Sequence, residues 1–443
     1  MSGVTFKEAL PMYLSPLPFL LAGFLGLQYL LWSWSPELSG QALLSFDSLF
    51  FFSGYLAINS MSLALFLASR PGWLEPWLGG LDRLYQLHRW LGVTALIAAV
   101  SHWLMEEWDD SLERWLGRSS LDSPDFHGWL DNLQEAAEDL GEVGFYLLVF
   151  LVLLSLFRYF PYRYWRYLHL GFPVIYLLLA WHSVLLAPSS WWQQPMGWLQ
   201  GSLLLLGCLA ALQSLTGRIG KSKKVIATLD QVTPLNNQML EVTCTLDKPL
   251  RRYQPGHFAR VTFDRLEGAH PFTLVPESGC SKRFSFCIKA LGDYTRQLLH
   301  HLQPGQKIQL EGPYGRFLPL KARARRQQVW VAAGVGITPF LACLSARKPL
   351  GSPPVVLHYA TRNADRDPLV ARLNKLAAGQ EGFTLQLHDS HKGERLSADC
   401  LEFQQKKVDV WYCGPEQLGQ TLQKELSNRK LSLRFHKEHF RFR

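Results

Sequence analysis

Long apolar stretches fill the first half of the chain, and short alternating patterns fill the second. A helix that crosses a membrane needs about 20 mostly apolar residues. Six stretches before residue 216 satisfy this requirement: residues 14–34, 45–68, 84–105, 141–159, 165–187 and 196–215. The pattern therefore predicts a six-helix transmembrane domain over residues 1–220. The alternative is that one weak stretch forms a re-entrant or surface helix.

Beyond residue 224 the chain alternates apolar and polar residues over short segments. Turn residues such as Pro255-Gly256 and Pro304-Gly305 separate these segments. Alternation with a period of two, interrupted by such turns, is typical of antiparallel strands. We therefore expect a small antiparallel β-barrel domain over residues 221–323.

From residue 328 onward the expected strands alternate with helices that begin near residues 338, 368 and 416. Such alternation produces a parallel sheet covered by helices. Residues 324–443 are thus predicted to form a Rossmann-like α/β domain. The predicted fold class is a multidomain membrane protein, with a helical bundle followed by an antiparallel β-barrel domain and an α/β domain.

Charge is unevenly distributed along the 443 residues, whose net charge is +9. The connection over residues 106–142 holds twelve acidic residues and two arginines. The connections after the second and fourth stretches and the segment after the sixth are basic through Arg70, Arg83, Arg158, Arg163, Arg166, Arg218, Lys221, Lys223 and Lys224. Because basic connections stay on the cytoplasmic side, both termini and the second half should be cytoplasmic and the acidic connection outside. We expect a multi-pass protein of a cell membrane, such as a bacterial inner membrane, with lipid rather than nucleic acid as its partner.

Seven cysteines are scattered without the close spacing of a zinc site or a disulfide framework. This usage is typical of a reducing compartment. The N-terminus has neither a basic leader region nor a small-residue cleavage site, so we expect no removable signal peptide.

Four histidines lie as two pairs within the third and fifth apolar stretches: His88 with His102, and His169 with His182. Separations of 14 and 13 residues correspond to roughly 20 Å along a helix, so each pair spans two levels of the membrane. Neutral imidazole is a good ligand for heme iron. The pattern predicts two b-type hemes, one held by His88 and His169 near the inner face and one by His102 and His182 near the outer face. The alternative is that these histidines hydrogen-bond to neighbouring helices or to water.

The rotation of the helices adds one further expectation. Fourteen residues return His102 to nearly the same face as His88, but thirteen leave His182 about 140° from His169 on an ideal helix. Pro173 lies between the second pair, and proline permits local rewinding in a membrane helix. We therefore expect the fifth helix to be distorted near residues 169–175.

Several short motifs occur in a fixed order in the second half. They are His270-Pro271-Phe272-Thr273, the segment 288–295, Gly312-Pro313-Tyr314-Gly315, the glycine loop 334–339, Cys413-Gly414-Pro415 and the terminal segment 435–440. Together with both histidine pairs, they make the chain similar to the ferric reductases and NADPH oxidases. The likeness covers nearly the whole chain, and it implies a β-barrel and an α/β domain of the ferredoxin-reductase type.

The resemblance implies FAD on the barrel, with the flavin ring against Thr273 and the backbone of the motif around it. It also implies which residues hold the phosphates and the nicotinamide. The FAD diphosphate would be held by Lys289, Gly292 and Thr295, and the nicotinamide nucleotide pyrophosphate by Gly334, Gly336 and Thr338. Cys413, followed by Gly414, would lie near the nicotinamide, and Phe440 would cover the flavin ring. The chain departs from the family pattern in having Lys289 where arginine is frequent, and in extending three residues beyond Phe440.

Arg362 follows the second strand of the α/β domain, where a dinucleotide 2′-phosphate binds. This position favours NADPH over NADH, with a simple loop charge as the alternative. For Cys413, core packing is the alternative.

These features predict a transmembrane oxidoreductase that moves electrons from cytoplasmic NADPH, through FAD and two hemes, to a small-molecule acceptor outside. The acceptor is either a ferric or cupric complex, which the acidic connection would attract, or dioxygen, giving superoxide. Those acids are equally compatible with a plain solvated surface. The alternatives are an electron donor to a dedicated membrane or periplasmic partner protein and a non-catalytic redox sensor.

Overall fold

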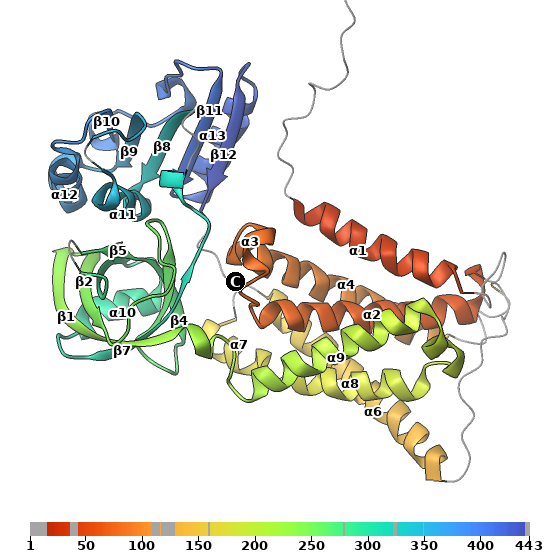
Figure 1. Cartoon of the computed structure of the whole chain (residues 1–443). Helices are drawn as coiled ribbons and strands as arrows, with labels where there is room; N and C mark the ends of the chain where they lie inside the picture. The colour runs from red at the N-terminus through yellow and green to blue at the C-terminus, as the bar shows by residue number, and fades with distance from the viewer. Residues whose placement is uncertain are drawn as a thin grey trace, which may run out of the picture. The chain divides into compact units, whose positions relative to one another are not determined.

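The computed structural model describes residues 16–35, 43–108, 116, 129–157, 160–277, 280–321, 326–348 and 350–438. The chain divides into two compact units between Lys221 and Ser222. The first unit is helical and the second contains two β-sheets (Figure 1).

A helix occupies each of the six apolar stretches of the first unit. The long helices are α1 (Pro16–Ser33), α2 (Phe46–Ala68), α4 (Leu81–Glu107), α6 (Trp129–Leu156), α8 (Phe172–Leu186) and α9 (Pro195–Leu215). Short α-helices precede two of them: α3 (Glu75–Leu78) lies before α4, and α7 (Tyr162–His169) lies before α8.

Within the described residues, four helical stretches are long and apolar enough to cross a membrane. They are Phe46–Ala68, Asn132–Leu156, Arg163–Leu186 and Pro195–Leu215. By length and hydropathy the described residues thus contain four candidate spans and not the predicted six, because the first and third stretches do not meet this criterion. The apolar helix Leu17–Ser33 is too short, and α4 is long but carries two histidines and charged residues at both ends, which lower its hydropathy.

The expected distortion of the fifth stretch is confirmed. α7 ends at His169 and α8 begins at Phe172, with Leu170 and Gly171 in a turn between them. Pro173 lies in the first turn of α8, where the N–H that proline lacks would have no helical partner. The break changes the rotation of His182 relative to His169.

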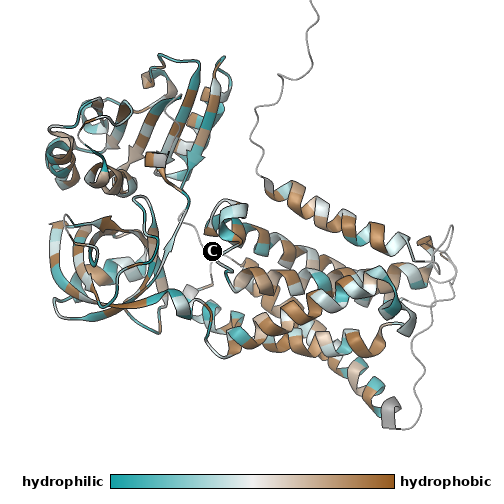
Figure 2. Ribbon diagram, in the orientation of Figure 1, coloured by the Kyte–Doolittle hydropathy of each residue, from teal (hydrophilic) through white to brown (hydrophobic). Residues whose placement is uncertain are grey.

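The helices pack around α2, which contacts α4, α8 and α9. Ile58 and Met61 of α2, Ala95 of α4, Leu148 of α6 and Tyr176 of α8 share one buried cluster. Hydrophobic residues predominate along the long helices (Figure 2). Many of them are exposed, for example Phe150 at 58% and Leu205 at 62%. A surface of this kind is suited to lipid.

The first sheet of the second unit is antiparallel and has seven strands in the order β4-β3-β7-β1-β2-β6-β5. The strands are β1 (Lys224–Asn236), β2 (Met239–Leu246), β3 (Phe258–Thr262), β4 (Ala269–Thr273), β5 (Val275–Pro276), β6 (Arg283–Lys289) and β7 (Lys307–Tyr314). The sheet curves around a core that includes Val242, Phe286 and Leu310 (Figure 1). Helix α10 (Asp293–His301) connects β6 to β7.

The prediction of a closed barrel is wrong, because the described edge strands β4 and β5 pair with β3 and β6 and not with each other. The two edges follow one another directly in the chain, with Leu274 alone between them. β5 is only two residues long, so it offers too little backbone to complete a ring of hydrogen bonds.

The second sheet is parallel, as expected, with the order β10-β9-β8-β11-β12. Its strands are β8 (Gln327–Ala333), β9 (Val355–Thr361), β10 (Phe383–Asp389), β11 (Lys407–Cys413) and β12 (Ser432–Lys437). Helices α11 (Thr338–Ala346) and α12 (Pro368–Ala377) pack on one face, and α13 (Glu416–Ser427) packs on the other. The expected boundary between residues 323 and 324 lies outside the described residues.

The register of this sheet places the carboxyl ends of β8 and β11 side by side. Ala332 of β8 lies opposite Cys413 of β11, so both strands end at the same edge. Ligands of parallel α/β sheets bind at the carboxyl ends of the strands.

Candidate functional site

The four membrane histidines lie on three helices of one bundle. His88 and His102 are on α4, His169 ends α7, and His182 is on α8. The ring centroids of His88 and His169 are 6.1 Å apart, with the ring planes at 68°. A metal ion bound at roughly 2 Å by each of two facing imidazoles separates their ring centres by about 6 Å. The pair predicted for the inner face is therefore spaced for a shared metal.

Three of these histidines contact a backbone carbonyl through Nδ1. The distances are 2.9 Å from His88 to Ala64, 2.9 Å from His102 to Phe50 and 2.8 Å from His182 to Ala137. Since a carbonyl only accepts hydrogen bonds, each Nδ1 carries the proton and donates it. Each Nε2 is then left with a lone pair, which is the form that binds a metal.

The fourth histidine follows the same scheme with a different partner. Nδ1 of His169 lies 3.2 Å from the hydroxyl oxygen of Ser155 on α6. Trp165 stacks on the His169 ring at 4.7 Å, and Phe172 contacts it edge-on at 4.7 Å. The ring is therefore held in one orientation by a hydrogen bond and two aromatic contacts.

Two glycines allow neighbouring helices to approach the outer pair of histidines. A β-carbon at Gly141 of α6 would lie 2.2 Å from Nδ1 of His182, and one at Gly54 of α2 would lie 3.1 Å from Cε1 of His102. Nothing in the amino-acid sequence singles out Gly54, Gly141 or Ser155. A lone serine or glycine in an apolar stretch is common, so only the packing reveals these contacts.

The donor set of the bundle fits heme. Four neutral imidazoles, each oriented through Nδ1, occupy two levels of α4 and of the broken α7–α8 helix. Bis-imidazole coordination fills both axial positions of an iron and is suited to electron transfer.

The motif His270-Pro271-Phe272-Thr273 forms β4, an edge strand of the seven-stranded sheet. An edge strand presents backbone groups on its open side, which suits contact with a planar ring system. The side chain of Phe272 instead packs on Phe286 in the core, with ring centroids 5.4 Å apart. Thr273 is also buried, so of the four motif side chains only those of His270 and Pro271 are partly exposed.

His270 connects β4 to the N-terminal turn of α10. Its ring stacks on Tyr294, with centroids 4.7 Å apart and planes at 27°. Burial lowers the pKa of His270, so this imidazole is neutral at pH 7. Burial also raises the pKa of Tyr294 to about 12, which keeps the phenol neutral.

Gly292 and Thr295 together shape the start of α10. The Thr295 hydroxyl accepts hydrogen bonds from the N–H groups of Leu291 and Gly292, both at 3.0 Å. This cap holds the loop before the helix, whose N-terminal amides favour a phosphate. Thr295 therefore hydrogen-bonds to the backbone of the loop, and these bonds would order the predicted diphosphate site.

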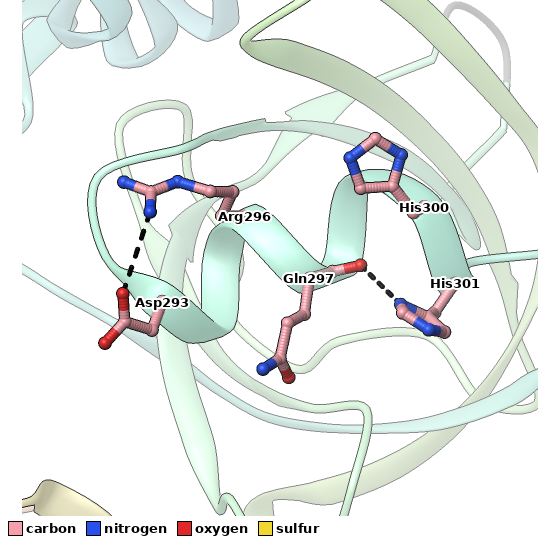
Figure 3. Close-up of a pocket in the computed structure, with 5 residues that line it drawn as sticks. All are labelled: Asp293, Arg296, Gln297, His300 and His301. Carbon is pink, nitrogen blue, oxygen red and sulfur yellow. Dashed lines mark hydrogen bonds and ion pairs between the residues drawn. The ribbon is translucent and has the colours of Figure 1, made fainter.

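The exposed face of α10 forms a shallow hollow (Figure 3). Its lining residues are Asp293, Arg296, Gln297, His300 and His301. Asp293 pairs with Arg296 at 3.8 Å, and Nδ1 of His301 lies 2.8 Å from the carbonyl oxygen of Gln297. Because one helix supplies this lining, the hollow gives no support for a cofactor site.

Lys289 lies at the end of β6, beside the glycine loop of the α/β sheet. Its Nζ is 3.4 Å from the position of a β-carbon at Gly334. The structure thus brings the predicted FAD phosphate residue next to the predicted nucleotide phosphate loop. A positive charge there stabilises a phosphate in either site.

The loop after β8 has the backbone geometry that glycine permits. Gly334 has a φ of 56°, and a β-carbon at Gly336 would lie 2.2 Å from the carbonyl oxygen of Cys413. The Thr338 hydroxyl donates to the carbonyl of Val335 at 3.1 Å, at the start of α11. A tight glycine loop that leads into a helix N-terminus fits a pyrophosphate.

Cys413 and Gly414 end β11 directly beside this loop. A β-carbon at Gly414 would lie 2.9 Å from Cβ of Ala333 and 2.8 Å from the hydroxyl of Tyr412, so the loop closes tightly here. Cys413 is 1% exposed, and burial, with the nearby carboxylate of Glu438, raises the pKa of Cys413 well above its ordinary value. The side chain is therefore a neutral thiol and not a thiolate nucleophile.

Two predicted residues lie at the margins of the site. Arg362 is exposed just after β9, where its carbonyl accepts a hydrogen bond from the N–H of His391. Phe440 lies outside the described residues. Glu438, two positions earlier, has its Oε1 3.8 Å from the β-carbon position of Gly315.

Two family models match the chain. The ferric reductase like transmembrane component matches residues 53–180, which include His88, His102 and His169. The FAD-binding domain matches residues 225–317, which include β4, Lys289 and Thr295.

Curated relatives match part of the chain. The heme-dependent oxidative N-demethylase beta subunit of Ectopseudomonas mendocina is 34% identical over 35% of this chain and 49% of its own. An NADPH oxidoreductase of Mycobacterium tuberculosis is 29% identical over 42% of this chain and 52% of its own. The chain spans about half the length of these relatives.

Among solved structures, the flavohemoglobin of Malassezia yamatoensis aligns with 86% of this chain and 94% of its own, at 14% identity and a TM-score of 0.47.

The transmembrane and FAD-binding matches occur in one chain, next to a Rossmann-like sheet. The chain combines a membrane segment similar to that of ferric reductases with an FAD-binding domain, and its second half is similar in fold to flavin-dependent reductases. Both matched segments are similar to the corresponding parts of the ferric reductase and NADPH oxidase superfamily.

Proposed function

We propose that the protein carries electrons across the membrane from cytoplasmic NADPH to an outer acceptor, through FAD and two b-type hemes. The acceptor is a ferric or cupric complex, or dioxygen. When bound, these cofactors supply a two-electron hydride transfer at the flavin and one-electron transfers at the hemes.

The observation that carries this proposal is that all four histidines of the helical unit are hydrogen-bonded in the same way, through Nδ1. Each Nδ1 lies within 3.2 Å of a hydrogen-bond acceptor, and the rings of His88 and His169 face each other at 6.1 Å. Histidines that only filled space between helices would have no reason to be oriented alike. One heme would be held by His88 and His169, and the other by His102 and His182.

The proposed sidedness rests on the charges between the helices. Arg70 precedes α4 and Arg83 lies in its first turn, while Arg163 and Arg166 lie in α7, at the ends where His88 and His169 occur. These ends would face the cytoplasm under the positive-inside rule, together with the nucleotide-binding unit. The segment of twelve acidic residues would face the opposite side, in a bacterial inner membrane or its equivalent.

In the second unit the proposed roles follow the contacts. The edge strand β4 would support the flavin ring, and the Thr295 cap with Lys289 would hold its diphosphate. Gly334, Gly336 and Thr338 would receive the nucleotide pyrophosphate. Cys413 and Phe440 would then lie beside the nicotinamide, and Arg362 would bind the 2′-phosphate that distinguishes NADPH from NADH.

One experiment tests the proposal as a whole. Visible spectra of the purified full-length protein in detergent are recorded with and without NADPH, and with and without oxygen. We expect two hemes per chain and their reduction by NADPH without added partners. A protein without heme absorbance contradicts the proposal.

The same preparation separates the alternatives. Consumption of a ferric chelate, or production of superoxide, identifies a small-molecule acceptor. Reduced hemes that persist with either acceptor indicate a dedicated partner protein. Hemes that NADPH does not reduce indicate a redox sensor.

A further inference from the structure

The hydrogen-bond acceptors of the four membrane histidines are not all of one kind. Backbone carbonyls serve His88, His102 and His182 at 2.8–2.9 Å, whereas a serine hydroxyl serves His169 at 3.2 Å. Since a backbone carbonyl is present whatever the residue, three of these contacts tolerate any side chain that keeps the helix. The fourth contact depends on one side chain, Ser155.

The direction of the Ser155 contact follows from the neighbouring helical turn. The hydroxyl of Ser155 lies 2.7 Å from the carbonyl oxygen of Leu151, to which it donates. A hydroxyl has one proton, so towards His169 its oxygen acts as an acceptor. Nδ1 of His169 is therefore the donor, and its Nε2 keeps the lone pair.

Ser155 helps to fix the orientation of the His169 ring, which lies at the end of a helix and not in its interior. His169 is the last residue of α7, next to the break before α8, and Ser155 is the penultimate residue of α6. The stacked Trp165 and the edge-on Phe172 restrict the tilt of the ring. The hydrogen bond to Ser155 restricts its rotation within the ring plane.

We propose that Ser155 is a positioning residue that orients His169 and sets the reduction potential of the heme between His88 and His169. This inference rests on the proposed function, which takes these two histidines as axial ligands. Donation from Nδ1 to an acceptor raises the basicity of the ligating Nε2. A more basic ligand stabilises ferric iron and lowers the reduction potential.

The longer contact to a hydroxyl makes His169 the weakest donor of the four ligands by this criterion. His102 and His182 both donate to carbonyls. The hydrogen bonds therefore raise the potential of the inner heme relative to the outer one. Without Ser155 the inner potential rises further, because the His169 ring then lacks its acceptor.

The test is a redox titration of the full-length protein in detergent, followed in the visible spectrum, for wild type and Ser155→Ala. We expect one of the two midpoint potentials to shift to a more positive value, or that heme to be lost, while the other is unchanged. Ser155→Thr keeps the hydroxyl and should restore the wild-type value. Ser155→Cys keeps the volume with a weaker acceptor and should also shift that midpoint positively, so the test holds even if the alanine variant fails to fold.

Ser53→Ala is the matched control. The hydroxyl of Ser53 lies 3.3 Å from Nδ1 of His102, but the carbonyl of Phe50 is closer, at 2.9 Å, and remains in the variant. We expect both midpoints to stay at their wild-type values.

The outcomes distinguish a failure of the proposed role of Ser155 from a failure of the proposed heme function. Two hemes with unchanged midpoints in Ser155→Ala and Ser155→Cys overturn the role of Ser155 and leave the heme proposal intact. A wild-type protein that binds no heme overturns both.

Discussion

The carbonyl oxygen of Cys413 occupies the space that a side chain at Gly336 would need, 2.2 Å from the position of its β-carbon. The contact joins the loop after β8 to the end of β11. Both loops belong to the proposed nicotinamide nucleotide site, so the geometry of one is set by the backbone of the other.

Gly336→Ala should therefore impair nucleotide binding. The added methyl group meets backbone, which yields only if the loop moves, and overpacking of this kind costs about 1–3 kcal/mol. We expect the KM for NADPH to rise roughly tenfold while heme content is unchanged. The control is Gly23→Ala, where nothing lies within 4 Å of the added carbon. Equal kinetics in the two variants would show that the loop tolerates the side chain.

His102→Ala should remove one heme and leave the flavin reducible by NADPH. The remaining ligand of that pair, His182, cannot fill both axial positions. Heme content measured on the purified protein should fall from two to one per chain, and delivery to an outer acceptor should stop. His301, on the exposed face of α10, provides the control: His301→Ala should retain both hemes. Two full hemes in His102→Ala would contradict the ligand assignment.

Arg362→Ala should weaken NADPH binding more than NADH binding. A charge-assisted hydrogen bond to a phosphate contributes about 1.5–3 kcal/mol, so we expect the KM for NADPH to rise at least tenfold. The KM for NADH should change less than about twofold, because NADH has no 2′-phosphate. Arg395→Ala removes an exposed arginine elsewhere in the same domain and should affect neither. An equal effect of Arg362→Ala on both nucleotides would reject the phosphate role.

Stability of the nucleotide-binding unit should fall with acid through His358. Nδ1 of this buried residue lies 3.1 Å from Nε2 of His388, and burial, with the neighbouring His388, lowers the pKa of His358 to about 4. The unfolded chain, with a pKa near 6.5, then binds more protons than the folded one between these values. The free energy of unfolding should therefore decrease as the pH falls from about 6.5 to 4, by up to about 3 kcal/mol.

Thermal unfolding of the full-length protein, followed by tryptophan fluorescence across this pH range, measures the effect of His358. His358→Gln should flatten the pH dependence, and His391→Gln, which changes an exposed histidine, should leave it as in wild type. A slope that survives in His358→Gln would assign the titration to other groups.

Much of the architecture could be predicted from local patterns. The period-two segments became β1, β2, β3, β6 and β7, and the β–α alternation became the parallel sheet, because strand and helix periodicity are local properties. The break between His169 and Phe172 was also predictable, since proline and the mismatch of helical rotation both act locally. Local patterns were misleading in two places. The hydropathy of α4 falls short of that expected for a membrane span, and the edge strands β4 and β5 do not pair with each other to close the sheet into a barrel.

The candidate site divides in the same way. The identities of His88, His102, His169 and His182 follow from the chain itself, because ionisable residues inside apolar stretches are rare and costly. Their partners do not follow from the chain. The contacts of Ser155, of Gly141 and of the carbonyl of Cys413 form only when segments that are distant in the sequence pack together. Hydrogen bonds and steric exclusion act over a few ångströms in space, and no spacing along the chain encodes them. The amino-acid order thus determined which residues can ligate and where helices and strands form, while packing decided which atom faces each imidazole and how closely the two nucleotide loops approach.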